Sequence, residues 1–182
     1  MRPRLVYALL SVFVVGADQI TKWLVRQHMG LHEYRELVSG LLSLSHVRNR
    51  GAAFGILSDA DLPYQSALFA VLSLVALGAI ALYARRLPVT ARLPQTALAL
   101  ILGGAVGNLI DRLRHGFVTD FVHVYWKQHV WPDFNVADSA ISVGVCLLLL
   151  DMLRAPATAE DKQAGRPEAD TFTNPSPAGP GE

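Results

Sequence analysis

The sequence has few charged residues and almost no cysteine. Asp, Glu, Lys and Arg make up 17% of its 182 residues, against about 25% in soluble domains, and the mean hydropathy is +0.32. The net charge of +1 gives no sign of the excess of basic residues that is typical of proteins that bind nucleic acid. The single cysteine, Cys146, excludes an internal disulfide framework and a cysteine-rich zinc site, and its apolar surroundings predict a packed, inert thiol. This composition excludes a disordered chain and an ordinary soluble globule, and it indicates a membrane protein.

Four apolar segments are long enough to cross a bilayer. They lie at about residues 5–25, 62–84, 93–110 and 134–153, and the second has no charged residue. Residues 1–154 are therefore predicted to form one membrane domain with four transmembrane helices. Residues 155–182 hold five of the ten prolines and one aromatic residue, Phe172. Because such a segment cannot bury enough apolar surface to offset its ordering entropy, we expect a disordered cytoplasmic tail.

The first apolar segment has two interpretations. Arg2 and Arg4, an apolar core and the small residues Val15-Gly16-Ala17 resemble a cleavable signal peptide. The apolar pattern resumes at Ile20, however, and this continuation favours a retained membrane helix.

The loop between the second and third segments indicates the orientation. It holds Arg85, Arg86 and Arg92 without an acidic residue, and short loops rich in Lys and Arg stay in the cytoplasm. Four spans place both termini on the same side as this loop. We therefore expect a multi-pass membrane protein with both termini in the cytoplasm.

The other two loops contain strand signals. Residues Leu42-Ser43-Leu44-Ser45 alternate with a period of two, and Phe117 to Trp126 is rich in β-branched and aromatic residues. Lone strands would leave backbone groups unpaired at the membrane, so the strands must pair with each other or dock on the helices. We expect a small sheet at the extracytoplasmic surface.

Polar residues gather at the membrane face that carries this sheet. Polar groups at membrane depth are costly and usually functional, so a one-sided cluster is more informative than any single residue. With four spans, the residues that fall at this face are Asp18, Lys22, Asn108, Asp111, Asp120, Asn135 and Asp138.

Each of these residues also has a purely structural interpretation. Asp18 and Lys22 are spaced to pair on one helix face, or Lys22 could extend to the membrane surface. Asp111 could end a helix and meet Arg112 or Arg114. Asn135 and Asp138 have the spacing of a helix cap, and Asp120 could be a solvated loop acid.

Capping does not explain why two carboxylates, Asp120 and Asp138, are delivered to the same end of the bundle. When two carboxylates lie close together, repulsion between their charges moves their pKa values apart, so that one is protonated and the other ionised. The ionised group can activate a water, and the protonated group can polarise a scissile carbonyl and help the amine leave. This chemistry is peptide hydrolysis without a covalent intermediate and without a metal.

Other chemistries fit less well. The sequence has no Gly-x-Ser-x-Gly elbow, no His-Glu-x-x-His pair and no Walker loop. The six histidines lie outside the four predicted spans, and a metal site built from some of them with Asp120 stays open as an alternative, although their spacing matches no familiar metal motif. We expect neither a metal nor another cofactor.

Five motifs occur in the order typical of one family. They are Asp18-Gln19-Ile20-Thr21-Lys22, Asn49-Arg50-Gly51-Ala52-Ala53-Phe54, Gly103-Gly104-Ala105-Val106-Gly107-Asn108-Leu109-Ile110-Asp111-Arg112-Leu113, Gly116-Phe117-Val118-Thr119-Asp120-Phe121 and Phe134-Asn135-Val136-Ala137-Asp138-Ser139. Together they resemble the bacterial lipoprotein signal peptidases, also called signal peptidase II. The resemblance covers about residues 5–154 and implies an all-α protein of the bacterial inner membrane, with four transmembrane helices, a small extracytoplasmic β-sheet cradle and the active site at the extracytoplasmic face.

The resemblance also implies roles for individual residues. Asp120 and Asp138 would be the catalytic pair of an aspartyl endopeptidase. Residues expected to bind substrate or to order the site are Asn49, Gly51, Asn108, Arg112, Asn135, Asp18 and Lys22. Asp111 and Ala137 would lie behind them, and His123 has no assigned role.

The family's substrates are prolipoproteins whose lipobox cysteine already carries a diacylglyceryl group, and cleavage occurs just before that cysteine. The implied partners are these precursors, membrane lipid and inhibitors of the globomycin type, with no nucleic acid, and the implied state is a monomer. The alternative is a proton-coupled membrane carrier, or another non-enzymatic four-span module, that uses Asp18, Asp111 and Asp138 as a relay.

Overall fold

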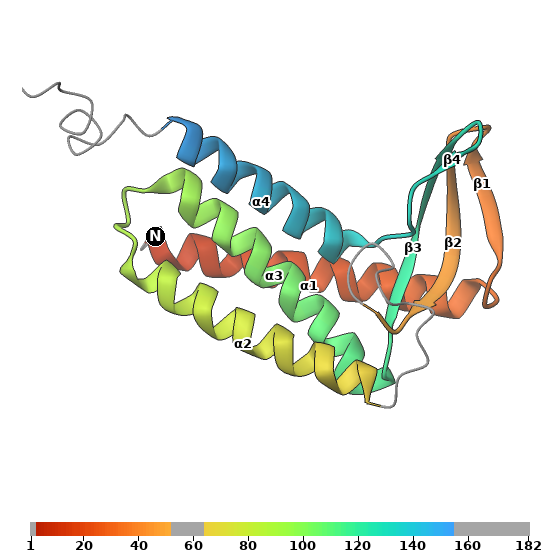
Figure 1. The fold of residues 1–182 in the computed structure, drawn as a ribbon, viewed down its shortest axis with the longest axis horizontal. Helices are drawn as coiled ribbons and strands as arrows, with labels where there is room; N and C mark the ends of the chain where they lie inside the picture. Colours follow the sequence, from red (N-terminus) through yellow and green to blue (C-terminus); the bar gives the residue numbers. More distant parts are fainter. Residues whose placement is uncertain (1–2, 52–63, 155–182) are drawn as a thin grey trace, which may run out of the picture.

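The computed structural model describes residues 3–51 and 64–154, which form four helices and a four-stranded sheet (Figure 1). In chain order the elements are α1 (Pro3–His28), β1 (Tyr34–Val38), β2 (Leu42–Asn49), α2 (Gln65–Arg86), α3 (Arg92–His115), β3 (Val118–Trp126), β4 (His129–Val130) and α4 (Val136–Arg154). The predicted tail 155–182 and residues 62–63 of the second predicted span lie outside the described residues.

The bundle is organised around α3, which packs against each of the other three helices (Figure 1). Its glycines allow this close packing. A Cβ atom at Gly103 would lie 2.8 Å from the backbone oxygen of Ser11 in α1, and one at Gly107 would lie 2.5 Å from Asp18 Oδ2. Because both positions face α1, a side chain at either would push the two helices apart. Gly107 thereby brings α3 close to the polar residues of α1.

All four helices have the length and apolar composition needed to cross a membrane. Only Gln65 and Ala70 of α2 are buried, and the helix is strongly apolar up to its last turn, as expected of a helix that faces lipid. The predicted fold class, four transmembrane helices with a small sheet, is confirmed. The expectation for Cys146 was wrong, because its side chain is exposed on α4.

Helices α1 and α3 extend several residues beyond their predicted ends. The first is continuous through Val15-Gly16-Ala17 and reaches His28, and α3 continues to His115, so these two histidines lie within helices rather than in loops. At the end of α3, Gly116 adopts a φ of 76° and donates its N–H to the Arg112 backbone oxygen. This left-handed residue turns the chain from α3 into β3.

The sheet has the order β1-β2-β3-β4, all antiparallel, and lies at the end of the bundle away from the N-terminus (Figure 1). The two predicted strands pair with each other as β2 and β3, which confirms the expected sheet. Their register places Val47 opposite Asp120 and Asn49 opposite Val118. The pairing therefore carries Asn49 and Asp120 together to the bundle end of the sheet.

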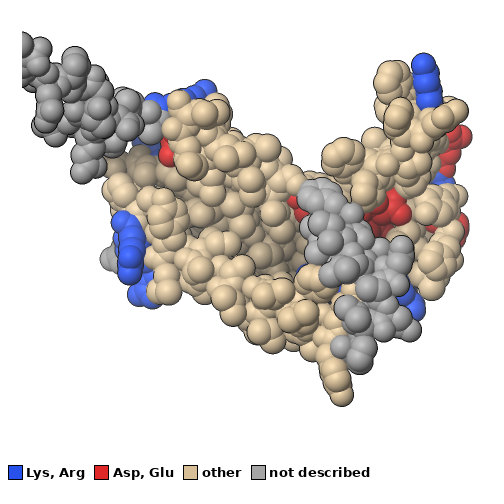
Figure 2. All heavy atoms as spheres, in the orientation of Figure 1, with Lys and Arg blue, Asp and Glu red and all other residues tan. Residues whose placement is uncertain are grey.

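Charged side chains are unevenly distributed over the surface. On the face shown in Figure 2, the middle of the helical bundle carries almost no charge, and Lys and Arg appear at the end away from the sheet and on the sheet itself. A belt of uncharged surface between charged ends is what a bilayer requires of a spanning bundle.

Candidate active site

Two buried carboxylates lie where the bundle meets the sheet. Asp120 comes from β3 and Asp138 from the first turn of α4, and their exposed fractions are 2% and 7%. Asn135 links them: its side-chain Nδ2 donates to Asp120 Oδ1 at 2.7 Å, and its backbone N–H donates to Asp138 Oδ2 at 3.2 Å. One residue therefore joins the strand carboxylate to the helix carboxylate.

Asn135 also caps α4, since its Oδ1 accepts the backbone N–H of Asp138 at 2.9 Å. Together with the bond from the Asn135 N–H to Asp138, this is a reciprocal capping box. The capping interpretation was therefore right, but the cap involves only Oδ1 of Asn135 and Oδ2 of Asp138. The amide nitrogen of Asn135 remains available for Asp120, and Asp138 Oδ1 remains available for another donor.

Each carboxylate accepts a second amide. Asn49 Nδ2 donates to Asp120 Oδ2 at 2.9 Å, and Asn108 Nδ2 donates to Asp138 Oδ1 at 2.8 Å. Asn49 comes from β2 and Asn108 from α3, so four different elements hold the pair. Asp120 is thus a buried, hydrogen-bonded acid of the sheet, and the solvated-loop interpretation was wrong.

Lys22 fixes the direction in which the Asn108 amide points. Lys22 Nζ donates to Asn108 Oδ1 at 2.8 Å, and Asn135 Nδ2 approaches the same oxygen at 3.2 Å. A lysine ammonium has no acceptor, so it can contact only the oxygen of the amide. The Asn108 nitrogen must therefore face Asp138, and Lys22 orients the site without touching either carboxylate of the pair.

Behind these residues lies a buried ionic cluster between α1 and α3. Lys22 Nζ is 2.8 Å from Asp18 Oδ2 and 3.4 Å from Asp111 Oδ2, and all three side chains are fully buried. The pairing of Asp18 with Lys22 was correctly expected, whereas the extension of Lys22 to the surface was wrong. Asp111 contacts Lys22 and Arg26 of α1, at 3.4 and 3.5 Å, rather than the arginines that follow it in the sequence.

The cluster also holds the two elements that carry the carboxylates. Asp18 Oδ1 accepts the backbone N–H of Ala137 at 3.0 Å, next to Asp138 in α4. Asp111 Oδ2 accepts the backbone N–H of Thr119 at 3.0 Å, next to Asp120 in β3. Each residue of the pair is thus preceded by a residue whose N–H is anchored on a buried carboxylate.

Arg112 and Gly51 lie at the edge of the site. An Arg112 guanidinium nitrogen donates to the Gly51 backbone oxygen at 3.0 Å, and the Gly51 N–H donates to Asn49 Oδ1 at 2.8 Å. Arg112 Nε is buried and has no hydrogen-bond partner among the described residues. One donor of the guanidinium is thus free in a buried position.

A cavity of about 320 Å³ between α2, α3 and α4 leads to the site. Asn108, Arg112 and Asp138 supply polar groups to its lining. The rest of the lining is apolar apart from one serine: Phe69, Leu72, Ser73, Ala76, Ile80, Ile101, Ala105 and Ile141. The cavity can therefore receive an apolar chain whose polar part reaches Asp138.

Burial and the charge of Asp138 raise the pKa of Asp120 to about 7. Burial is the larger cause, and the amides of Asn49 and Asn135 act in the opposite direction because they stabilise the ionised form. A carboxyl group with such a pKa can exchange a proton near neutral pH. Among the described residues, no group of three His, Cys, Asp or Glu side chains is placed to hold a metal ion.

Comparison with known proteins places this arrangement in a family. The family model described as signal peptidase (SPase) II matches residues 10–154. This chain belongs to the signal peptidase II family. A lipoprotein signal peptidase of Geobacter sulfurreducens is 50% identical over 151 residues, covering 81% of this chain and 93% of its own, and one of Geobacter metallireducens is 49% identical over 149 residues, covering 82% and 91%.

The fold comparison agrees with the sequence comparison. A solved structure described as a bacterial membrane enzyme is 30% identical, with a TM-score of 0.73, and the match covers 91% of this chain and 93% of that one. The chain is therefore a multi-pass membrane peptidase of the signal peptidase II family. Family membership favours the peptidase hypothesis over the carrier hypothesis.

All residues expected to form the signal peptidase II site occur in one connected network. Asp120, Asp138 and Asn135 form its centre, with Asn49 and Asn108 on either side. The remaining members, each reached through a hydrogen bond or ion pair given above, are Asp18, Lys22, Gly51, Asp111, Arg112 and Ala137. Their roles in catalysis remain predictions.

Several members of the network were not predicted. Arg26 Nη1 donates to Thr119 Oγ1 at 3.0 Å, and Gln19 Nε2 donates to the Gly107 backbone oxygen at 3.1 Å. Arg26 could have been found, because Asp18, Lys22 and Arg26 follow one another at intervals of four on one helix face. No comparable spacing indicates Gln19 or Thr119.

His123 also has a partner that the sequence did not indicate. Its Nδ1 lies 2.5 Å from Asp133 Oδ1, just before the segment that enters α4. Beside it, Phe134 exchanges backbone hydrogen bonds with Val122. The contact holds the segment that delivers Asn135 against β3.

Proposed function

We propose that the chain is an aspartyl endopeptidase that removes the signal peptide from diacylglyceryl-modified prolipoproteins, cleaving just before the lipidated cysteine. The observation that carries this proposal is the pair of buried carboxylates, Asp120 and Asp138, joined through Asn135 at the polar end of an apolar cavity. Two carboxyl groups that share one proton can supply both the base and the acid that peptide hydrolysis needs.

The environments of the two carboxyl groups support different roles. Asp138 lies in the first turn of α4, where the helix dipole favours a negative charge. Asp120 lies on a strand, without such a dipole, and its raised pKa favours the protonated form. In this proposal Asp138 removes a proton from the attacking water. Asp120 donates its proton to the scissile carbonyl oxygen as the water attacks. When the C–N bond then breaks, the proton held by Asp138 passes to the leaving amine, and a hydroxyl of the tetrahedral intermediate returns its proton to Asp120.

The surroundings of the pair suit a substrate held in the membrane. The apolar cavity between α2, α3 and α4 can accept an apolar part of the precursor, and the free Nε of Arg112 can donate to a substrate carbonyl. The acyl chains on the cysteine would keep the scissile bond at membrane depth. With both termini in the cytoplasm, this end of the bundle would face the extracytoplasmic side.

Lipid recognition can be tested with two matched precursors. The purified full chain is incubated in detergent with a diacylglyceryl precursor and with its unlipidated twin, and cleavage is followed by mass spectrometry. We expect a single cut before the cysteine in the lipidated precursor only, and inhibition by globomycin. Equal cleavage of both precursors would show that the lipid is not recognised, and undiminished cleavage in saturating globomycin would contradict the proposed site.

The pH dependence of cleavage is a separate prediction. If Asp120 must be protonated, kcat/KM should fall as the pH rises through about 7, because Asp120 then loses its proton. Asn49→Ala removes an amide that stabilises ionised Asp120, so the pKa should rise further. The alkaline limb of the pH profile of kcat/KM should then move to higher pH, by about one pH unit for a hydrogen bond of ordinary strength.

A control on the same strand separates this effect from a general disturbance of β2. Ser43 contacts the Tyr125 hydroxyl rather than an aspartate, so Ser43→Ala should leave the alkaline limb in place. A limb that stays fixed in Asn49→Ala, or that moves to lower pH, would show that Asp120 is not the group whose ionisation ends activity.

A further inference from the structure

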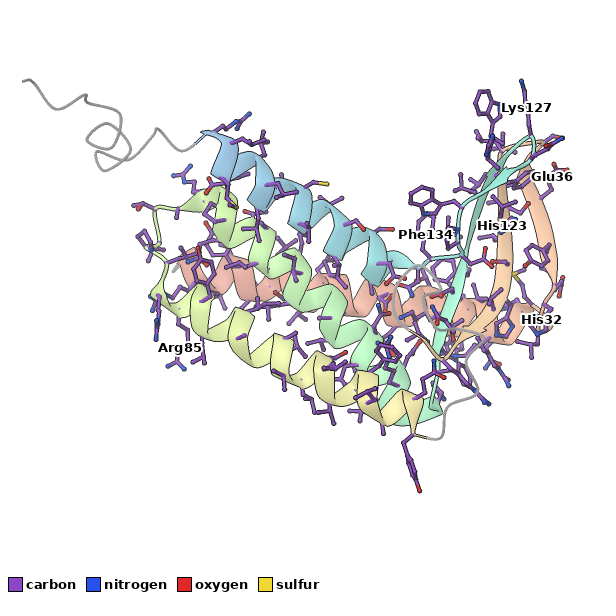
Figure 3. All side chains as sticks on the ribbon, in the orientation of Figure 1. His32, Glu36, Arg85, His123, Lys127 and Phe134 are labelled. Atoms are coloured by element: carbon purple, nitrogen blue, oxygen red, sulfur yellow. The ribbon has the colours of Figure 1, made fainter. Side chains whose placement is uncertain are left out.

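The end of the bundle away from the aspartates contains a second cavity, of about 350 Å³, between α1, α2 and α3. Arg4 and Tyr7 of α1 and Arg85 of α2 supply polar side chains to its lining. Figure 3 shows Arg85 at the end of α2 that is farthest from the sheet. The remaining lining residues are apolar except for Ser11 and Gln95: Ala8, Ser11, Ala81, Ala84, Gln95, Leu98, Ala99 and Leu102.

This cavity continues along the bundle as an apolar groove. A second hollow, of about 640 Å³, shares Ala8, Ser11 and Leu102 with the first and extends to Gly16 in α1 and Val106 in α3. From Arg4 to Gly16 the helix rises by about 18 Å, at about 1.5 Å per residue. One leaflet has a hydrocarbon depth of about 15 Å, half of a core about 30 Å thick. The groove is therefore long enough for one acyl chain.

The charged end of the cavity has no ionic partner among the residues that the structure describes. Among the described residues, neither Arg4 nor Arg85 forms an ion pair. Gln95 does not offer its amide nitrogen, because Nε2 lies 3.2 Å from the Ala84 oxygen and 3.4 Å from the Leu87 oxygen, where it closes the end of α2. The charged groups left for a ligand are two guanidinium side chains, beside the Tyr7 hydroxyl, and guanidinium groups match the geometry of a phosphate.

We propose that this cavity binds one phospholipid with an anionic headgroup, whose phosphate contacts Arg4 and Arg85 and whose acyl chain lies in the groove between α1 and α3. Charge complementarity selects the headgroup, and the apolar walls select a lipid over a soluble phosphate. Since α2 packs mainly on α3, the headgroup would fill the space between α1 and α2 at this end of the bundle. The site is separate from the carboxylate pair and does not depend on its mechanism.

Native mass spectrometry of the full chain can test the site. The protein is released from mixed micelles containing equal amounts of phosphatidylglycerol and phosphatidylcholine, and retained lipids are counted. We expect one phosphatidylglycerol per chain to be retained in preference to phosphatidylcholine. Inorganic phosphate alone should not displace it. Equal retention of both lipids, or displacement by phosphate, would overturn the proposal.

Variants assign the binding to this cavity. The double variant Arg4→Gln with Arg85→Gln should reduce the preference for phosphatidylglycerol by roughly a hundredfold, because each lost charged contact is worth about tenfold, or about 1.4 kcal/mol. Arg86→Gln removes the same charge from the next residue of α2, which does not line the cavity, and should leave the preference intact. Ala8→Phe fills the groove where the two hollows meet and should weaken retention of both lipids. An equal effect of Arg86→Gln would overturn the proposal.

A photo-crosslinking side chain in place of Leu102 identifies the occupant in membranes. A lipid adduct supports the proposal. An adduct with residues 155–182 of the same chain, or with a second copy, would replace the lipid by a protein occupant and overturn it.

Discussion

Replacing either Asp120 or Asp138 with Asn is expected to lower the rate of cleavage of a lipidated precursor by at least about a thousandfold. Such losses are typical when one member of a catalytic unit is removed. Asn has nearly the shape of Asp but cannot remove a proton from water or donate one from a carboxyl group. The measurement is the cleavage rate of a diacylglyceryl precursor, with each variant purified in the same detergent.

The two substitutions should not add. If Asp120 and Asp138 act as one unit with a single shared proton, either loss removes the whole reaction, and the double variant should be no slower than the single variants. Additive losses would instead show that the two residues contribute independently. Cleavage within tenfold of the unmodified protein by either single variant would contradict the two-aspartate mechanism.

Asp151→Asn is a matched control for this experiment. Asp151 lies in α4 like Asp138, but three residues before the helix ends at Arg154, far from Asn135 and Asn108. The same chemical change there should leave cleavage unaffected. The variants should also stay folded, because the side-chain oxygen of an Asn at position 120 can still accept a hydrogen bond from the amide of Asn49 or Asn135.

The sequence predicted the bundle well because each span contains a long apolar run, which can be recognised without tertiary information. It predicted β2 and β3 from alternation and β-branched content. It missed β1 because all five of its residues are exposed, so that no alternation exists, and it missed β4 because that strand has only two residues. These short strands become recognisable only through their pairing with β2 and β3.

The side on which a residue of α4 lies was also not predictable. A helix apolar on every side gives no periodic signal that separates the bundle face from the lipid face, because lipid is as apolar as the bundle interior. Cys146 was therefore placed on the wrong side. The site residues were predictable from the order of their motifs, but their partners were not. The contact of Lys22 with Asn108 joins residues 86 positions apart and depends on how closely Gly107 lets the helices approach.

Lys22→Met is expected to destabilise the protein by about 3–5 kcal/mol, the usual cost of removing one partner from a buried ion pair. Asp18 would lose its cation at 2.8 Å, whereas Asp111 would keep Arg26 at 3.5 Å. For a chain of this size the melting temperature should fall by roughly 10 °C. Cleavage should also fall at temperatures where the variant is fully folded, because the Asn108 oxygen loses the donor that turns its nitrogen towards Asp138.

A double-mutant cycle with Asp18→Asn identifies the cause of the destabilisation. When Asp18 is already uncharged, Lys22→Met no longer leaves that carboxylate unpaired, so the double variant should be more stable than the sum of the single effects predicts, by about 1–3 kcal/mol. Lys127→Met, a change of the same kind at an exposed position, should alter neither melting nor cleavage. If stability recovers in the double variant while cleavage stays low, Lys22 has two separate effects. It stabilises the protein through Asp18, and it supports cleavage through Asn108. Strictly additive losses would contradict the ion pair as the source of the stability.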